Sequence, residues 1–359
     1  MLALSYFRIA DFRSLSCTMQ RRRLSFLRRV CPSLLLIVST AAFSAPLRMY
    51  FIDVEGGQAT LLVAPSGKSM LIDTGWPGFA GRDADRIVAA AKAAGIAKLD
   101  YLLVTHYHDD HVGGVAQLAE RIKIETFVDH GPNREDSDDT RANYAAYQKV
   151  MLGAKRTVVK PGDRIPLEGL EVEVVSADGA LITMPLAGAG QANPLCAAEP
   201  APPEDATENA RSVGVVITYG KLRILDLGDL TKKKELQLVC PRNLVGTVDL
   251  FVVSHHGFNQ SNTRALVHAV RPRVAIMDNG ARKGASTDAW QTVYESPGLA
   301  DLWQLHYAVK GGKDHNVASD FIANPAEKCE GKQINITAAA DRTMTVTNLR
   351  TGFSKTYKK

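Results

Sequence analysis

The sequence predicts an α/β layered domain, and two observations indicate this class. Short apolar segments of strand length alternate with segments whose apolar residues recur every three or four positions, as on one face of a helix. The composition is that of a folded chain, with 45% hydrophobic and 23% charged residues among 359. This alternation argues against a helical bundle or a β-sandwich, because each of those folds uses one type of element.

The expected elements follow one another without an internal repeat. Strands are expected at residues 49–54, 59–64, 70–73, 101–105, 125–129, 172–176, 213–219, 222–227, 250–254 and 274–278. Helices are expected at residues 82–94, 112–122, 141–152 and 263–270. Residues 334–357 should add two or three strands at the C-terminus. The acidic segment 131–140 and the Pro-, Ala- and Gly-rich segment 185–209 are expected to be long loops.

Residues 1–44 have the layout of a secretion signal, with a basic stretch, an apolar run and small residues before Pro46. Seven arginines and one aspartate give this segment +6, so residues 45–359 carry −1 of the total charge of +5. We expect a signal peptide, export to the periplasm or the medium, and no membrane span after its removal. The nearly neutral remainder has no clear nucleic-acid footprint.

Three cysteines remain after residue 44, namely Cys196, Cys240 and Cys329. In an oxidising compartment one pair of them could form a disulfide, and the expected pair is Cys196 with Cys240. One cysteine would then stay unpaired. None of the three has the spacing of a zinc cluster.

The segment His106-Tyr107-His108-Asp109-Asp110-His111 carries the clearest indication of chemistry. It directly follows the apolar strand expected at residues 101–105. Three imidazoles and two carboxylates at the end of a strand form the ligand set that a transition metal requires. The next residues, Gly113 and Gly114, allow a tight turn into the following helix. The sequence therefore predicts a metal site that begins at this segment.

The pattern HxHxDH followed by two glycines resembles the signature of the metallo-β-lactamase superfamily. Residues 51–54 and 71–75 resemble its opening strands, residues 225–229 the strand before its bridging aspartate, and residues 252–257 the strand before its late histidine. The spacing is most similar to the subgroup related to the hydrolase domain of ComEC-type DNA-uptake proteins. The resemblance implies a four-layer αββα sandwich formed by a single domain over residues 45–359, with a C-terminal strand extension.

The resemblance also implies roles for individual residues. His106 and His108 would hold a first metal ion, and Asp110, His111 and His255 a second, with Asp229 bridging the two. Asp73 would orient ligands by hydrogen bonds from outside. Asp110 or Asp229 would orient the attacking water. His256 would protonate the leaving group, contribute from outside the ligand shell, or simply pack in its loop.

One family ligand is missing, because no histidine occurs between Gly131 and Ser254. Candidates to fill the first site are His130, Asp178, Asn209 or water. Competence-type members also lack this histidine and have an asparagine near the corresponding segment, which favours Asn209. A site with fewer imidazoles tolerates harder ions, so the expected cofactors are two divalent ions, zinc or alternatively manganese. The remaining histidines, including His268, His306 and His315, are expected to be packing or surface residues.

The expected activity is hydrolysis by a metal-bound hydroxide, which requires no nucleophilic side chain. The expected substrate is a small molecule or a phosphodiester, or a related anionic compound. A β-lactam, lactone or thioester hydrolase is the first alternative, and a non-catalytic metal-binding or scaffold protein of the same fold is the second. The sequence leaves the oligomeric state open.

Overall fold

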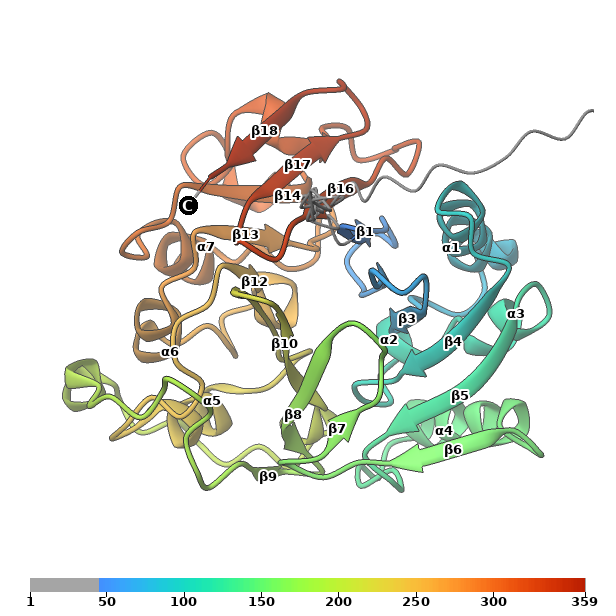
Figure 1. Cartoon of the computed structure of the whole chain (residues 1–359), viewed down its shortest axis with the longest axis horizontal. Coiled ribbons are helices and arrows are strands. Elements are labelled where there is room, and N and C mark those ends of the chain that lie inside the picture. The colour runs from blue at the N-terminus through green and yellow to red at the C-terminus, as the bar shows by residue number, and fades with distance from the viewer. Residues whose placement is uncertain (1–44, 359) are drawn as a thin grey trace, which may run out of the picture. The chain divides into compact units, whose positions relative to one another are not determined.

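The computed structural model describes residues 45–358, which belong to one compact unit (Figure 1). The predicted signal peptide lies outside the described residues. The first of two sheets has the strand order β18-β17-β16-β1-β2-β3-β4-β5-β6. Its strands are β1 (Leu47–Phe51), β2 (Thr60–Val63), β3 (Ser69–Ile72), β4 (Lys98–Leu103), β5 (Lys123–Asp129), β6 (Lys155–Val158), β16 (Ile334–Ala338), β17 (Met344–Asn348) and β18 (Ser354–Tyr357).

The second sheet has the order β15-β14-β13-β12-β11-β10-β8-β7, with β9 paired to β8. Its strands are β7 (Arg164–Ile165), β8 (Glu171–Ala177), β9 (Ala180–Leu181), β10 (Gly214–Tyr219), β11 (Leu222–Asp226), β12 (Leu250–Val252), β13 (Val274–Met277), β14 (Asp301–His306) and β15 (Ile322–Asn324). Strands β11 to β15 are parallel, as are β3 to β6. Parallel strands place their carboxyl ends at one edge, where loops gather functional groups.

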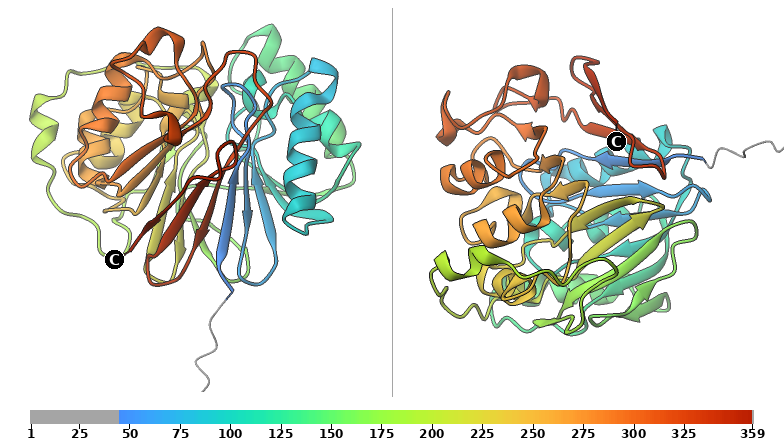
Figure 2. Two further views of the ribbon diagram at one scale, coloured as in Figure 1. Left: turned by 90° about the horizontal axis from the view of Figure 1, so that it is seen from above. Right: turned by 60° about the vertical axis from the view of Figure 1, so that its left-hand side comes forward.

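The two sheets face each other, and helices cover their outer faces (Figure 2). Helices α1 (Arg82–Ala93), α3 (Val115–Ala119) and α4 (Asp138–Val150) pack on the first sheet, and α5 (Lys232–Val239), α6 (Arg264–Val270) and α7 (Thr287–Tyr294) pack on the second. The predicted four-layer αββα sandwich is therefore confirmed. Neither sheet could be stable alone, because each has two apolar faces to bury.

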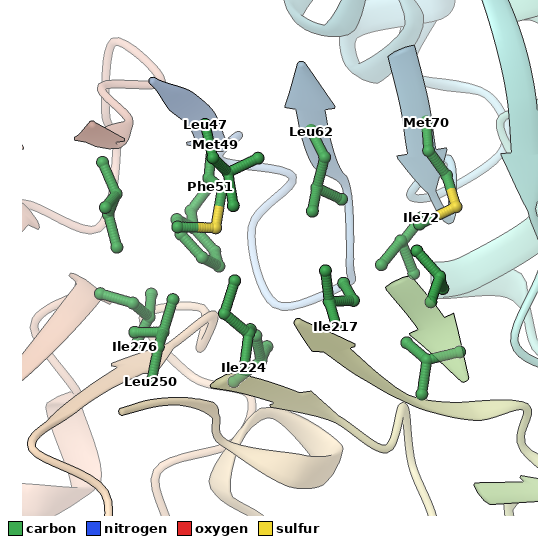
Figure 3. Close-up of a cluster of buried hydrophobic side chains, with 14 of the residues drawn as sticks. Leu47, Met49, Phe51, Leu62, Met70, Ile72, Ile217, Ile224, Leu250 and Ile276 are labelled. Atoms are coloured by element: carbon green, nitrogen blue, oxygen red, sulfur yellow. The ribbon is translucent and has the colours of Figure 1, made fainter. Parts of the chain in front are cut away.

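The core between the sheets consists of aliphatic side chains that alternate along facing strands. Leu47, Met49 and Phe51 of β1 meet Ile224 and Leu250 of the second sheet (Figure 3). Burial of a single side chain of this kind stabilises a fold by roughly 1.5–3 kcal/mol. This packing fixes the distance between the sheets and hence between the loops at their edges.

The C-terminal strands extend the first sheet rather than forming a separate layer. Strand β16 pairs antiparallel with β1, with Met49 opposite Ile336, and β17 and β18 follow outward. The three strands confirm the pattern predicted for residues 334–357. Patterning missed α7 and the short strands β6, β7, β9, β14 and β15.

The helix predicted at residues 112–122 is present but shorter, because α3 spans only Val115–Ala119 and a separate short helix precedes it. Helix α2 (Asp109–Val112) ends at Gly113, and α3 begins after Gly114. A Cβ atom at Gly114 would lie 2.2 Å from the carbonyl oxygen of Thr74, so only glycine permits this close approach of two backbones. The break therefore packs the metal-ligand segment against the loop after β3.

Cys196 and Cys240 form a disulfide, which confirms the predicted pair, and Cys329 is a free cysteine. Within residues 45–358, no helix combines the length and the apolar character needed to cross a bilayer.

Candidate metal centre

The predicted ligands come together at the carboxyl ends of strands from both sheets. Asp73 follows β3, and the segment that starts with His106 follows β4. Asp229 follows β11 in the second sheet, and the pair His255-His256 follows β12. These side chains are buried, except that His108 and Asp109 are partly exposed. The parallel arrangement of the strands thus explains why residues more than 100 positions apart share one site.

Four donor atoms form a compact group: Asp110 Oδ2, His111 Nε2, Asp229 Oδ1 and His256 Nε2. His111 Nε2 lies 3.3 Å from the Asp110 oxygen, 3.2 Å from the Asp229 oxygen and 3.1 Å from His256 Nε2. His256 Nε2 lies 3.0 Å from Asp110 Oδ2 and 3.5 Å from Asp229 Oδ1. Ligands about 2.0 Å from a tetrahedral zinc ion are separated by about 3.3 Å. The four donors therefore have the dimensions of a tetrahedral site.

Hydrogen-bond partners outside the four donors orient the imidazole of His111. Asp73 Oδ2 lies 2.7 Å from His111 Nδ1 and accepts a 2.6 Å hydrogen bond from the Thr105 hydroxyl. A carboxylate on the outer nitrogen fixes the tautomer so that Nε2 presents its lone pair to a cation. The sequence predicted this contact for Asp73.

A second, looser group lies on the other side of Asp229. His106 Nε2 is 3.1 Å from His108 Nδ1 and 4.0 Å from Asp229 Oδ2. His255 Nε2 is 3.3 Å from the same Asp229 oxygen. Asp229 thus directs one carboxylate oxygen toward each group, which is the geometry of a bridging ligand. His108 is oriented by Glu135, whose Oε2 lies 3.0 Å from His108 Nε2.

The structure exchanges the roles predicted for the two late histidines. His256, not His255, joins Asp110 and His111, while His255 lies on the side of His106 and His108. The physical reason is the backbone turn after β12, where His255 and His256 both have positive φ, 54° and 51°. The turn sends consecutive rings in different directions, with an interplanar angle of 76°.

Three residues were candidates for the missing ligand of the first metal ion, and only Asn209 reaches the looser group of donors. Asn209 Nδ2 lies 3.5 Å from His255 Nε2. His130 instead lies 2.9 Å from Glu208 Oε2, and its ring packs on Tyr107. Asp178 accepts two hydrogen bonds from the Arg134 guanidinium. Neither His130 nor Asp178 joins the cluster, because each one binds another side chain instead.

The protonation states follow from burial and from the facing carboxylates. Burial lowers the pKa of His255 to about 4, so its imidazole is a neutral potential ligand. Burial also opposes the charged form of His256, but the carboxylates of Asp229 and Asp278 overcome it and raise its pKa to about 10. The imidazoles hold the pKa of the Asp229 carboxyl well below its usual range despite burial. The site thus favours a positive charge between these side chains.

The donor set fits a divalent cation. Asp229 Oδ1 and Asn209 Oδ1 are both buried and have no hydrogen-bond partner among the described residues. Buried polar atoms without partners are costly, and a cation bound among the four donors would satisfy the Asp229 oxygen. Imidazoles that give up a proton to a cation, together with carboxylates, suit zinc and similar ions.

A cavity of about 400 Å³ opens over the donors, lined among others by Trp76, Glu135 and Lys283. The ammonium of Lys283 contacts Asp110 Oδ2 and lies 4.5 Å from the centre of the Trp76 ring. Sequence reasoning missed these three residues. The available signal for Lys283 was its position in the loop after β13, at the same edge as the ligand loops.

Comparison with known proteins supports this picture. Residues 53–190 match the model of the metallo-β-lactamase superfamily. Recombination protein 2 of Haemophilus influenzae is 28% identical over 231 residues, which are 64% of this chain and 24% of that protein. ComE operon protein 3 of Bacillus subtilis is 24% identical over 70% of this chain and 30% of its own length.

A hydroxyacylglutathione hydrolase of Acidiphilium cryptum is 42% identical over 118 residues, 33% of this chain and 39% of that protein. The chain thus spans less than two fifths of the length of each of these relatives. Residues 53–190 thus match the metallo-β-lactamase superfamily, and the sequence motif and the two-sheet architecture agree with that match.

Proposed function

We propose that this chain is an exported metal-dependent hydrolase that acts on a phosphodiester or a related anionic substrate. The observation that carries the proposal is the tetrahedral spacing of Asp110, His111, Asp229 and His256 around a common point. The second group, His106, His108 and His255, supports two ions that share Asp229.

The chain's own residues would hold and orient the reactants. Bound divalent cations supply a lowered pKa for an attacking water and charge neutralisation in the transition state. Asp229 is placed to orient that water, because one of its oxygens faces each group of donors. His256 is held as a ligand in this scheme, so a water molecule rather than His256 would protonate the leaving group. This assignment replaces the proton-donor role expected from the sequence.

Two features support an anionic substrate. Lys283 lies at the mouth of the cavity, where its ammonium can bind a phosphate oxygen once a cation replaces it as the partner of Asp110. The relatives named for recombination and competence share the match over most of this chain. The charge of −1 on residues 45–359 and the carboxylate of Glu135 in the cavity favour a small diester over a long polyanion.

A thioester is the second candidate substrate. The segment shared with the hydroxyacylglutathione hydrolase of Acidiphilium cryptum has the highest identity of the three relatives, 42%. Thioester hydrolysis would use the same cation centre as phosphodiester hydrolysis, because both reactions pass through a transition state with negative charge on oxygen.

Export is supported by the basic and apolar layout of residues 1–44 and by the Cys196–Cys240 disulfide. Disulfides of this kind persist in oxidising compartments. Cell fractionation of a C-terminally tagged chain should find it outside the cytosol and shortened by about 44 residues. Full-length protein in the cytosol would refute export.

The activity is tested on the full chain, with bound metal counted by mass spectrometry. A chromogenic phosphodiester, a thioester and a chromogenic β-lactam are then offered to the protein. Diester cleavage that is lost in Asp229→Ala supports the proposal, and Asp178→Ala serves as the matched control that retains activity. Preference for the thioester or the β-lactam would replace the substrate assignment. Full metal occupancy without turnover of any substrate would instead indicate a non-catalytic protein.

A further inference from the structure

A second group of donor side chains lies apart from the metal centre. Asp53, His306 and Cys329 each direct one potential ligand atom toward the others, all within 4.8 Å. Asp53 Oδ1 lies 2.7 Å from His306 Nε2, and Asp53 Oδ2 accepts a 3.3 Å hydrogen bond from the Cys329 thiol. Glu55 adds a carboxylate, with Oε1 at 3.9 Å from the Cys329 sulfur.

These donors come from three separate parts of the chain. Asp53 follows β1 of the first sheet, and His306 ends β14 of the second. Cys329 lies in the loop between β15 and β16. Asp53 and His306 are at most 1% exposed, whereas Glu55 is partly exposed and leaves the group open to solvent. An ion could therefore enter without unfolding the sheets.

The chemistry of the group is that of a metal site. One thiol, one imidazole and two carboxylates are the ligand types that zinc accepts in proteins. A sulfur at 2.3 Å and an oxygen at 2.0 Å from a tetrahedral zinc ion are about 3.5 Å apart. The observed sulfur–oxygen distances of 3.3 and 3.9 Å bracket this value. In addition, His306 Nδ1 is buried without a hydrogen-bond partner among the described residues, so the ring is not locked by a second contact.

We propose that Asp53, Glu55, His306 and Cys329 form a separate binding site for a divalent cation of the zinc type. The cation replaces the thiol proton and the proton that His306 Nε2 shares with Asp53 Oδ1, and it joins the imidazole to the carboxylates that already surround it. The negative charges of Asp53 and Glu55 are balanced by Arg82 and Arg86.

A cation at this site would link the two sheets to the loop between β15 and β16. It would also contact the metal centre indirectly, because Asn279 donates a hydrogen bond to the His306 carbonyl oxygen and follows Asp278, which lies 3.3 Å from His256. We assign the cation a structural role, since its ligands come from both sheets and from the loop between β15 and β16.

The test uses cobalt(II) as a spectroscopic probe on the full chain in a Cys17→Ser, Cys31→Ser background. Cys196 and Cys240 are joined in the disulfide, so Cys329 is the single free thiol of this protein. The metal centre around Asp229 contains no sulfur ligand. A thiolate-to-cobalt charge-transfer band in the near ultraviolet therefore reports on the proposed site alone.

The proposal expects this band to report one cobalt ion per chain in addition to those bound at the metal centre, and zinc to displace it. Cys329→Ser should abolish the band and lower the zinc content by one equivalent. His306→Gln should weaken cobalt binding at this site. Asp229→Ala should leave the band intact, which separates failure here from failure of the proposed hydrolase function.

Absence of the band in the folded parent protein at saturating cobalt would overturn the proposal, whatever the variants do. The group would then be a buried ion pair of Asp53 and His306 beside an ordinary thiol. An unchanged zinc content in correctly folded Cys329→Ser would lead to the same conclusion.

Discussion

The chain has two groups of buried donor side chains at the same edge of its sheets, and they differ in how their charge is balanced. Around Asp229 the carboxylates face imidazoles and a single ammonium, that of Lys283. Around Asp53 they face one imidazole and two guanidinium groups, those of Arg82 and Arg86. Imidazoles can exchange a proton for a cation, whereas guanidinium groups keep their charge.

The difference indicates distinct roles for the two groups. The group around Asp229 needs added positive charge and opens into a cavity, which suits catalysis. The group around Asp53 is largely neutralised by its neighbours, so a cation there would bind more weakly and serve structure. Four changes test this contrast, from the largest expected effect to the smallest.

Asp229→Ala should have the largest effect, because the carboxylate joins both groups of donors at the metal centre. Loss of metal-based charge stabilisation is worth several kcal/mol, so kcat/KM should fall by roughly 1,000-fold or more. Steady-state kinetics with the best substrate measures this change. Asp178→Ala removes a carboxylate that binds Arg134 outside the site and should leave kcat/KM within about twofold. Equal losses in both variants would contradict the assignment.

Glu235→Gln supplies a baseline for a buried carboxylate that belongs to neither group. Burial raises the pKa of Glu235 to about 7, and the amide N–H groups of Thr263 and Asn262 offset only part of that effect. Because the folded-state pKa exceeds the unfolded value of 4.5, its stabilising contribution is full below pH 4.5 and is lost as the pH rises through about 7.

As the pH rises from about 4.5 to above 7, the free energy of unfolding of the wild type should therefore fall by on the order of 3 kcal/mol. The Glu235→Gln variant should not show this loss. Urea unfolding of the metal-stripped proteins at pH 5 and pH 8 gives the comparison. The exposed Glu171→Gln is the matched control and should follow the wild type. Parallel pH profiles for Glu235→Gln and wild type would show that burial alone does not shift this carboxyl.

Asp73→Asn tests the orienting contact at the metal centre. The amide cannot match the charged acceptor 2.7 Å from His111 Nδ1, so metal affinity should fall about 10- to 100-fold. Competition with a chromogenic chelator measures the affinity. The cobalt–thiolate band at Cys329 should not change. A loss of that band together with the metal centre would mean that the two groups are one coupled unit.

Arg86→Gln should have the smallest effect and the opposite sign. Its guanidinium lies 3.3 Å from both Asp53 Oδ2 and Glu55 Oε1, so its removal leaves these carboxylates freer to bind a cation. Cobalt affinity at Cys329 should rise by up to about tenfold, because one solvent-screened unit charge at this range is worth on the order of 1.4 kcal/mol. Arg121→Gln, which removes an arginine paired with Asp85, is the control. Weaker cobalt binding in Arg86→Gln would contradict the inference that the guanidinium groups neutralise the carboxylates around Asp53.

The sequence revealed the two groups unequally. Four ligands of the metal centre lie within six consecutive residues that begin at His106, so their spacing alone predicted the site. Asp53, His306 and Cys329 are separated by 253 and 23 positions, and none of them is unusual by itself. Their proximity follows from the pairing of distant strands, which local patterns do not encode.

The exchange of His255 and His256 was unpredictable for a related reason. Two adjacent histidines have the same local sequence context, and the left-handed backbone at both residues decides which ring faces Asp110. Likewise, strand β14 lacks a clear period, because both of its faces are buried. The regular strands β1 to β5 were found because apolar runs and turn residues coincide there.

The central claim is that Asp110, His111, Asp229 and His256 enclose a divalent cation. Anomalous diffraction at the zinc absorption edge, from crystals of the full chain grown with zinc, tests it most directly. The account predicts an anomalous peak about 2.0–2.2 Å from Asp110 Oδ2, His111 Nε2, Asp229 Oδ1 and His256 Nε2. An ordered site in zinc-saturated protein with these four side chains in place and no peak between them would contradict it.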